Sequence, residues 1–314
     1  MEKQRIDIGV VVLHYNNAED TIECVQSFLE NLDTKNFKIL VFDNCSPNNS
    51  GKKIKEKFDG IENVDVYLND KNLGFGGGNN KGIEILRARF EPKFLVLSNN
   101  DIVLIEKHFF KKIDEEYNIS HFAELGPMII TADGRCDSNP IFDKPYLKNV
   151  AIDELKEMKK LLVSYKHHYV WLHNFLRRLK FRISRKTRAI RRGQLRKNKE
   201  PGNFLLRREN IVCHGCFMVF SQEFFKYYEG IDLHSFMYAE EDILFAQIAF
   251  KNLKTIYSPN IQIYHKEDGS LKATFKESRK RKIFVLEKSI EANEGYIQFL
   301  NELEEKGFKF NEGD

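Results

Sequence analysis

The sequence predicts an α/β fold in which helices cover both faces of a mostly parallel sheet. Short apolar runs rich in Val and Ile alternate with amphipathic segments, and several of these runs end in polar residues. Apolar runs of this length indicate strands that are buried on both faces. With 314 residues, the chain is long enough to bury a full core in one large domain or two.

The first half of the chain supplies this alternation in order. Residues 6–13 form the first apolar run, and residues 22–32 follow with apolar side chains on one helical stripe, for which Asn17 is a suitable cap. The next predicted elements are strand 37–42, helix 51–58, strand 64–68, a helix that begins near Gly77, and strand 94–97. Strands and helices that alternate in this way imply a parallel sheet.

The second half of the chain is less regular. Its predicted elements are helix 106–117, strand 126–130, strand 211–220, a helix that opens at residue 240, the strand pair 255–257 and 261–264, and a mixed-charge helix at 272–306. Between these elements, residues 145–202 carry many Lys and Arg, few acids, and interleaved Leu, Tyr, Trp and Phe. This composition predicts a basic amphipathic helical insertion.

Two partners suit the basic insertion. Residues 156–197 fit the anionic headgroups of a membrane surface, and they fit equally a helical hairpin that packs on the sheet domain with its charges in solvent. Nucleic acid is not an expected partner, because no recognition motif accompanies the charge. Periodicity alone leaves the choice between lipid and protein open.

Composition bounds the cellular setting. The 50 basic and 46 acidic residues nearly cancel, so the net charge points to no particular partner. Five cysteines, an odd number, fit a reducing compartment better than a disulfide framework. Cys213 and Cys216 have redox or zinc spacing, but no second pair accompanies them, so we interpret them as buried structural thiols. No apolar run has bilayer-spanning length and no signal-peptide core is present, so we expect a cytoplasmic protein.

Polar residues at three predicted strand ends share one rim of the sheet. These are Tyr15, Asp43 and Asp101, and ligands of open α/β sheets bind at such ends. The glycine-rich residues 74–78 precede a predicted helix, a combination that suits a phosphate. Asn79 stands where a dinucleotide fingerprint needs its third glycine, which argues against a nicotinamide enzyme. A phosphate loop near a carboxylate suggests a nucleoside diphosphate bridged by a divalent cation.

An acidic triplet marks the other candidate site. Glu240, Glu241 and Asp242 open a predicted helix, where capping explains one acid but not three in a row. His265 follows a later predicted strand, and it is either a structural histidine or part of this site. The triplet suggests acid–base chemistry.

Seven short motifs in order carry a family resemblance. They are residues 14–17, 41–46, 72–79, 99–101, 215–218, 238–242 and 264–265. Together they resemble an inverting family 2 glycosyltransferase, and most closely its rhamnosyltransferase-like branch of bacterial surface-polysaccharide synthesis. The resemblance covers about residues 6–270, without the basic insertion and the terminal helix.

The resemblance implies a GT-A fold and a division of the chain. The glycosyltransferase domain spans residues 1–270, with a nucleotide-sugar half at 1–130 and an acceptor half at 203–270. The basic insertion at 145–202 interrupts this domain, and a C-terminal helix and tail follow at 271–314.

The resemblance also implies residue roles. The donor-binding residues are Tyr15, Asn16, Asp43, Asn44, Ser46, Asn72, Gly74, Phe75, Gly76, Asn79, Asn99, Asn100 and Asp101. The acceptor-binding residues are His214, Gly215, Tyr238 and Glu240. Asp242 is the implied general base, with Glu241 as the alternative, and Asp101 and His265 are the implied ligands of Mn²⁺ or Mg²⁺.

Two positions depart from the family pattern. Asn99 stands where the first Asp of an Asp-x-Asp motif is usual, which leaves one strong metal carboxylate. The triplet continues as Glu-Glu-Asp-Ile where Glu-Asp-Val-Asp is commoner, so the general base stays open between Glu241 and Asp242.

The implied activity is transfer of rhamnose or another hexose, with inversion, from a UDP- or dTDP-linked donor. The acceptor would be a lipid-linked or free oligosaccharide in capsule, O-antigen or other surface-polysaccharide synthesis, in the cytoplasm or on the inner face of the plasma membrane. The alternative is an inactive nucleotide-sugar-binding homologue that serves in an assembly complex, because a fold does not guarantee activity.

Overall fold

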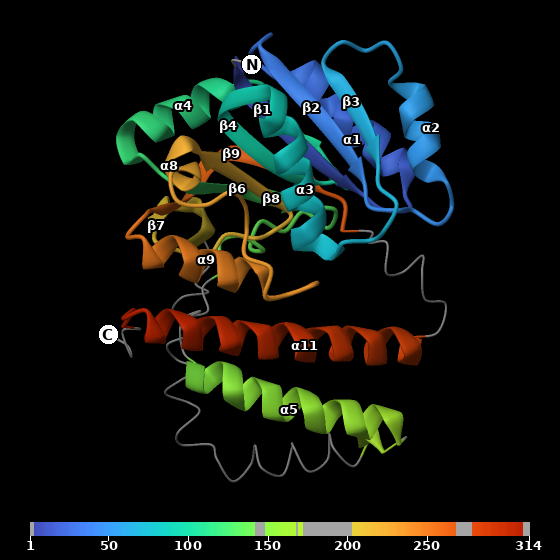
Figure 1. The fold of residues 1–314 in the computed structure, drawn as a ribbon, viewed down its shortest axis with the longest axis vertical. Helices are drawn as coiled ribbons and strands as arrows, with labels where there is room; N and C mark the ends of the chain where they lie inside the picture. Colours follow the sequence, from blue (N-terminus) through green and yellow to red (C-terminus); the bar gives the residue numbers. More distant parts are fainter. Residues whose placement is uncertain (1–2, 142–147, 168, 172–202, 268–277, 310–314) are drawn as a thin grey trace.

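The computed structural model describes residues 3–141, 148–167, 169–171, 203–267 and 278–309 (Figure 1). Within these ranges the chain forms a mixed, mostly parallel nine-stranded sheet, in the order β3-β2-β1-β4-β8-β6-β9-β5 with β7 paired to β9. The strands are β1 Gln4–His14, β2 Phe37–Asp43, β3 Val64–Leu68, β4 Phe90–Asn99, β5 Ile102–Leu104, β6 Glu124–Thr131, β7 Arg208–Glu209, β8 Phe217–Ser221 and β9 Thr255–His265. The α/β class predicted from the sequence is confirmed, and the arrangement is consistent with a GT-A fold.

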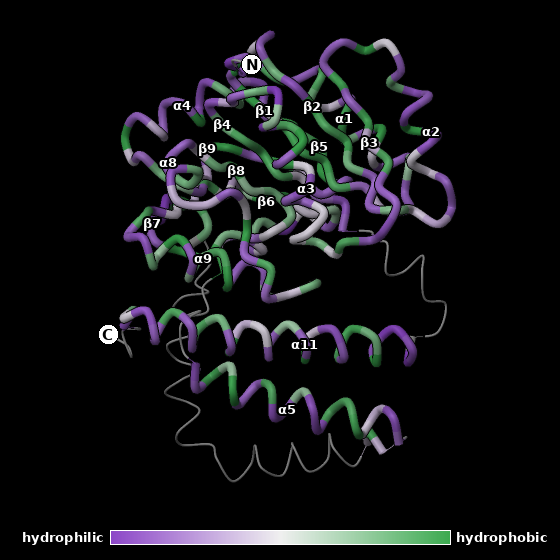
Figure 2. The backbone as a smooth tube through the Cα atoms, in the orientation of Figure 1, coloured by the Kyte–Doolittle hydropathy of each residue, from purple (hydrophilic) through white to green (hydrophobic). Residues whose placement is uncertain are grey.

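Helices lie on both faces of this sheet. The helices of the described residues are α1 Ala18–Asn31, α2 Ser50–Lys57, α3 Gly74–Arg89, α4 Phe109–Ser120, α5 Lys148–Lys166, α8 Gln222–Phe225, α9 Glu240–Phe250 and α11 Ser278–Glu305, with a short 3₁₀ turn at Asn203–Leu205. Side chains from α1, α2 and α4 fill one apolar cluster, and side chains from α3, α8 and α9 fill another on the opposite face. Figure 2 shows the strands as the apolar centre of this layered domain.

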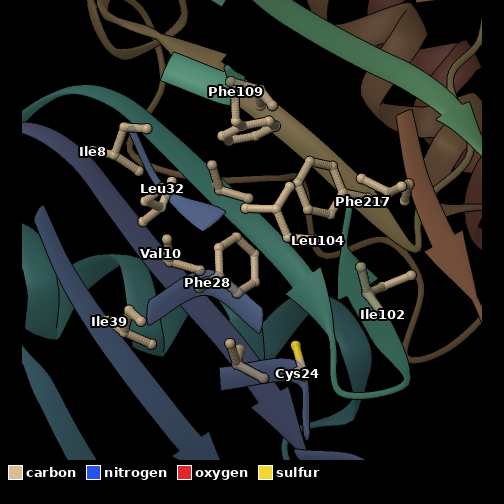
Figure 3. Packing of buried hydrophobic residues seen from close by; sticks show 14 of the residues in the cluster. Ile8, Val10, Cys24, Phe28, Leu32, Ile39, Ile102, Leu104, Phe109 and Phe217 are labelled. Atoms are coloured by element: carbon tan, nitrogen blue, oxygen red, sulfur yellow. The ribbon is translucent and has the colours of Figure 1, made fainter. Parts of the chain in front are cut away.

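Aromatic packing dominates the larger cluster. Phe28 of α1 and Phe109 of α4 both contact Phe217 of β8, with ring centroids 6.3 and 5.7 Å apart (Figure 3). All three side chains are fully buried. Because Phe217 belongs to the second half of the chain, this cluster joins the two halves into one core.

The parallel half aligns its strand ends. β1 pairs in parallel with β2 and β4, so that His14 lies opposite Asp43 and Leu13 lies opposite Asn99. β2 pairs in parallel with β3. The carboxyl ends of these strands therefore share one rim, as the sequence predicts.

The second half adds strands of mixed direction. β8 runs antiparallel to β4, and β5 runs antiparallel to β9 with Ile102 opposite His265. The predicted strand 211–220 was wrong in its first residues, because the strand begins at Phe217 and Val212 makes only an isolated bridge to Ile141. The predicted strand pair 255–257 and 261–264 is one strand, β9, with a register shift against β6.

Helices α5 and α11, which are far apart in the sequence, form an antiparallel pair outside the sheet layers (Figure 1). α11 packs on α9, and three ion pairs join α5 to α11. Their closest atoms lie 2.6 Å apart in each pair: Lys148–Glu304, Lys159–Glu294 and Lys166–Glu287. One face of α5, within the basic insertion, therefore packs on protein, while residues 172–202 lie outside the described residues. None of the described helices is long and apolar enough to cross a bilayer.

Candidate active site

The end of β1 is fixed by a buried histidine that the sequence prediction missed. His14 Nδ1 lies 2.6 Å from Thr21 Oγ1, and its Nε2 lies 2.8 Å from Ser50 Oγ. Burial lowers the pKa of His14 to about 4, against the opposing charge of Asp43, so the ring is neutral near pH 7. His14 thus ties β1 to the beginnings of α1 and α2 and sets the position of Tyr15 and Asn16.

Asp43 ends β2 inside a tight polar turn. Its Oδ1 accepts hydrogen bonds from the Ser46 amide at 3.1 Å and the Ser46 hydroxyl at 2.6 Å. The Asn16 amide donates to the same hydroxyl oxygen at 2.9 Å, which links the loops after β1 and β2. Gly51 is required beside this carboxylate, because a Cβ there would lie 2.2 Å from Asp43 Oδ2. The predicted donor residues Asn16, Asp43 and Ser46 are therefore in contact.

The glycine-rich stretch has a different geometry from the predicted one. Helix α3 begins at Gly74 instead of near Gly77, and Gly74 has a φ of +75°. The Gly74 amide donates to Asn72 Oδ1 at 2.8 Å, and the Phe75 amide donates to the Phe236 carbonyl at 2.9 Å. The amides of Gly74 and Phe75 are thus bonded within the protein, so these two do not face a phosphate as the sequence analysis expected of residues 74–78.

Later glycines of α3 allow close packing on β1. A Cβ at Gly78 would lie 2.7 Å from Leu13 Cδ1, and one at Gly82 would lie 2.4 Å from Val11 Cγ1. Both glycines are within the helix and buried. Because these glycines lack side chains, α3 can approach the sheet closely. Gly78, which the sequence analysis included in the phosphate-binding stretch, thus has a packing role.

Predicted donor residues Asn44 and Asn72 support the loop before α3. Asn44 Oδ1 accepts from the Leu73 amide at 2.9 Å, and Asn44 Nδ2 donates to the Gly74 carbonyl at 2.9 Å and to Asn72 Oδ1 at 3.1 Å. Asn79 is 1% exposed, and its Oδ1 has no hydrogen-bond partner among the described residues. The side-chain amides of Asn44 and Asn72 therefore hold the loop before α3 in place.

Asp101 and His265 come together across the β5–β9 ladder. Asp101 Oδ2 lies 3.2 Å from His265 Nε2, and both side chains are largely buried. Asp101 Oδ1 is buried and, within the described part of the chain, without a hydrogen-bond partner. The neighbouring Asn100 turns to α1, where its Nδ2 donates to Thr21 Oγ1 at 3.0 Å, while Asn99 ends β4 beside the carbonyl of Cys216.

His214 lies next to this pair. Its ring centroid is 6.1 Å from that of His265, and its Nδ1 accepts from the Cys216 amide at 3.1 Å. Burial lowers the pKa of His214, against the opposing charge of Glu241. A neutral ring that accepts through Nδ1 carries its proton on Nε2, so His214 is a hydrogen-bond donor at that atom.

The acidic triplet reaches the same place from α9. Glu241 Oε1 accepts from the Gly215 amide at 3.0 Å, and a Cβ at Gly215 would lie 3.0 Å from that oxygen. Tyr238 and Ala239, directly before the triplet, have φ angles of +74° and +60°. Left-handed backbone at two such residues is strained and concentrates at functional sites. Asp101, His265, His214, Gly215 and Glu241 thus form one continuous row.

Two more carboxyl groups are buried near Glu241. Burial, and then the charge of Glu241, raises the pKa of Glu240 to about 7 and that of Glu124 in β6 to about 8. Glu240 Oε1 and the Tyr238 hydroxyl have no hydrogen-bond partner among the described residues. Sequence reasoning missed Glu124, and its only signal was a lone acid at the start of an apolar run.

The predicted metal ligands fit a divalent cation that also binds the donor. Across the described ranges, no group of three or more His, Cys, Asp and Glu side chains is arranged to hold a metal ion by itself. Asp101 offers a buried oxygen without a partner, with the His265 imidazole beside it. One carboxylate together with substrate phosphates is a usual way for proteins to hold Mg²⁺.

Residues 9–118 match the model of the family described as glycosyl transferase family 2. This region contains the strand ends that carry Tyr15, Asp43 and Asp101. This stretch of the chain is therefore similar to family 2 glycosyltransferases. The rest of the row, from His214 to Glu241 and His265, lies beyond the matched residues.

Solved structures of S. aureus TarS are similar to this chain. TarS 1–349 in complex with UDP-GlcNAc is 23% identical, covering 44% of this chain and 39% of that chain with a TM-score of 0.37. TarS 1–349 alone is 14% identical, covering 83% of this chain and 60% of that chain with a TM-score of 0.48. The matched regions span less than two thirds of those chains. A sequence search of curated proteins found no match.

Proposed function

We propose that this family 2 domain is an inverting glycosyltransferase that moves a sugar from a nucleoside diphosphate to a saccharide hydroxyl. The observation that carries the proposal is the row from Asp101 and His265 through His214 to Glu241. It sets a strand-end carboxylate for the donor diphosphate beside a carboxylate oriented by the Gly215 amide. The family match over residues 9–118 supports the donor side of this site.

Glu241 is the general base. It takes the proton of the acceptor hydroxyl while the hydroxyl oxygen forms a bond to the anomeric carbon, and the bond from that carbon to the diphosphate oxygen breaks with its electron pair. The sequence favoured Asp242, but the Gly215 amide holds Glu241, and the charge of Glu241 is felt by His214, Cys216 and Glu240. A base must lie within hydrogen-bond reach of the proton that it removes.

The donor side uses the strand-end loops. Tyr15 and Asp43 hold the base of the donor nucleotide, with Asn16 and Ser46 beside it. Asp101 and His265 would hold Mn²⁺ or Mg²⁺, and the cation would supply positive charge against the negative charge of the departing diphosphate. His214, which the sequence assigned to acceptor binding, lies beside His265, so its Nε2–H is a neutral hydrogen-bond donor between the two sides of the site.

A turnover assay with two matched variants tests this function. We expect the purified chain to release nucleoside diphosphate from a UDP- or dTDP-linked hexose when a saccharide acceptor is present, with inverted anomeric configuration in the product by NMR. Glu241→Gln should lower kcat by about 10²- to 10⁴-fold and leave nucleotide binding intact. Asp242→Asn, the matched control, should retain most of the activity.

The outcomes separate the alternatives. A loss of turnover in Asp242→Asn and not in Glu241→Gln moves the base to Asp242. A wild-type chain that binds nucleotide sugars and never transfers them is the inactive homologue that serves in an assembly complex.

Within this function we propose a rhamnosyl or other hexosyl donor and a lipid-linked acceptor of surface-polysaccharide synthesis. The support is the order of the seven sequence motifs. The end of the α5–α11 pair where α5 stops and α11 begins adds support for a membrane-bound acceptor. There Trp171 is 70% exposed and Tyr169 37% exposed, close to Lys166 and Arg279. Exposed aromatics with cations suit a membrane interface. Failure to sediment with anionic vesicles at low salt would contradict this part.

A further inference from the structure

Residues 230–239, which we name the bridging loop, contact the donor side of the site. The Phe236 carbonyl accepts from the Phe75 amide at 2.9 Å, and a Cβ at Gly74 would lie 2.3 Å from that carbonyl oxygen. Farther along α3, the side chain of Asn80 donates to the Ile231 carbonyl at 2.7 Å and accepts from the Ile231 amide at 2.9 Å. The bridging loop therefore covers the beginning of α3.

The same loop leads directly into the acceptor side. Gln247 of α9 accepts from the Asp232 amide at 3.1 Å and donates to the Gly230 carbonyl at 3.2 Å. The loop then passes through the strained residues Tyr238 and Ala239 into the first turn of α9, which carries Glu241. A shift of the bridging loop would thus move the covering of α3 and the general base together.

The C-terminal helix α11 holds the middle of the loop through His234. His234 Nδ1 lies 2.5 Å from Asp232 Oδ1 within the loop, and Nε2 lies 3.1 Å from Glu302 Oε1 of α11. Gly295 of α11 lies so close that a Cβ there would be 1.8 Å from the His234 carbonyl oxygen. Lys288 of α11 places its Nζ 5.5 Å from the centroid of the Phe236 ring.

We propose that His234 is a positioning residue that, through Glu302, fastens the bridging loop to α11 and so sets the donor covering and Glu241 at once. The inference rests on the proposed transferase function for its catalytic readout, but its structural readout is independent of that function. It gives α11, which lies outside the resemblance to known transferases, a part in organising the site.

The attachment depends on the charge of His234. Burial opposes protonation, but the hydrogen bonds to Asp232 and Glu302 outweigh it and raise the pKa of His234 above its ordinary value. The charged groups that act on His234 are Asp232 from the loop and Glu302 from α11, and Lys306 acts on Glu302. From α9 and α3, the neutral amides Gln247 and Asn80 bind the loop backbone at Asp232 and Ile231. The attachment is strongest at low pH and weakens as the pH rises through the raised pKa.

Hydrogen exchange at the Phe75 amide tests the attachment, because this amide is bonded to the loop. At pH 6, Glu302→Ala should speed its exchange by roughly fivefold or more, and Glu302→Gln, which keeps an acceptor without the charge, should fall between wild type and Glu302→Ala. Glu305→Ala, the control in the last turn of the same helix, should leave exchange unchanged. Above the raised pKa of His234, the difference between wild type and Glu302→Ala should shrink.

Steady-state transfer supplies the catalytic readout. At pH 6, Glu302→Ala should raise the donor KM and lower kcat together, each by roughly fivefold or more, while Glu305→Ala changes neither. Equal Phe75 exchange in wild type, Glu302→Ala and Glu305→Ala would overturn the inference. A wild-type chain without any transfer would contradict the proposed function alone, since the exchange experiment would still decide the role of His234.

Discussion

The two halves of the site are held in different ways. In the donor half, Asp43 ends β2 and Asn16 lies in the loop directly after β1. The Ser46 hydroxyl joins them, because it donates to Asp43 Oδ1 and accepts from the Asn16 amide. In the acceptor half, Glu241 depends on Gly215 of another segment, on a strained loop and on a distant helix. The donor half is thus a local consequence of the strand order, and the acceptor half is a product of long-range packing.

The buried ionisable groups differ in the same way. Among the groups whose pKa burial shifts to a stated value, His14 is buried between two hydroxyls in the donor half, and Glu240 and Glu124 are buried near Glu241 in the acceptor half. Burial favours the neutral form of each group, so it lowers the pKa of the histidine and raises the pKa of the two acids. The contribution of His14 to the free energy of unfolding should therefore rise with pH, and the contributions of Glu240 and Glu124 should fall with pH.

The largest expected effect is on the acceptor half. The pKa of Glu240 is raised from 4.5 to about 7, so the folded chain binds this proton more tightly, and the free energy of unfolding falls as the pH rises from 4.5 to about 7. Glu240→Gln cannot ionise and should remove this fall, gaining on the order of 3 kcal/mol over wild type between pH 4.5 and 8. Urea unfolding across this range measures the difference.

His14 should make the free energy of unfolding change with pH in the opposite direction, which serves as a control. Its pKa is lowered from 6.5 to about 4, so its contribution to the free energy of unfolding is present above pH 6.5 and is lost as the pH falls toward 4. A Glu240→Gln variant whose stability followed the wild-type pH curve would contradict the burial of a titrating Glu240.

The local half was the better predicted part of the fold. Strand 64–68 was predicted with the residues that β3 has, and Asn17 caps α1 as expected, its side chain accepting from the Asp20 amide. In the second half, two strands were predicted at 255–257 and 261–264, but β9 continues through Pro259, because a register shift in the β6–β9 ladder accommodates the proline. Propensity gives strand character, while tolerance of a proline depends on the neighbouring strand.

The site shows the same limit. Strand ends gave Asp43 and Asp101 from the sequence, because parallel strands bring their ends together. Three successive acids cover about 200° of a helix surface, so the sequence could not tell whether Glu241 or Asp242 faces Gly215. Only the packing of α9 beside the segment before β8 decides which carboxylate meets that amide.

A smaller effect tests the packing of α3 on the donor half. A Cβ at Gly82 would meet Val11 of the central strand at 2.4 Å, so Gly82→Ala should overpack the core. We expect a loss of about 1–2 kcal/mol, after the usual gain from replacing glycine in a helix. Urea unfolding at pH 7 measures it.

Gly76→Ala is the matched control on the same helix. A Cβ there would lie 3.1 Å from Cδ2 of Leu233, an exposed and flexible side chain that can turn aside. Its stability should stay within about 1 kcal/mol of wild type. If Gly82→Ala and Gly76→Ala lower the free energy of unfolding equally, close packing of α3 on β1 does not explain why residue 82 is a glycine.

The smallest expected effect on stability concerns the α5–α11 helix pair, which lies outside both the donor half and the acceptor half. Lys159 and Glu294 are each about half exposed, and solvent screens their 2.6 Å ion pair. Lys159→Ala should therefore lower the free energy of unfolding by no more than about 0.5 kcal/mol, and a double-mutant cycle with Glu294→Ala should give a coupling of similar size. Raising the salt concentration should reduce this coupling further, because the charges are exposed. A coupling above about 2 kcal/mol would mean that the ion pair is shielded from solvent, as it would be if another segment of the chain covered this face of the helix pair.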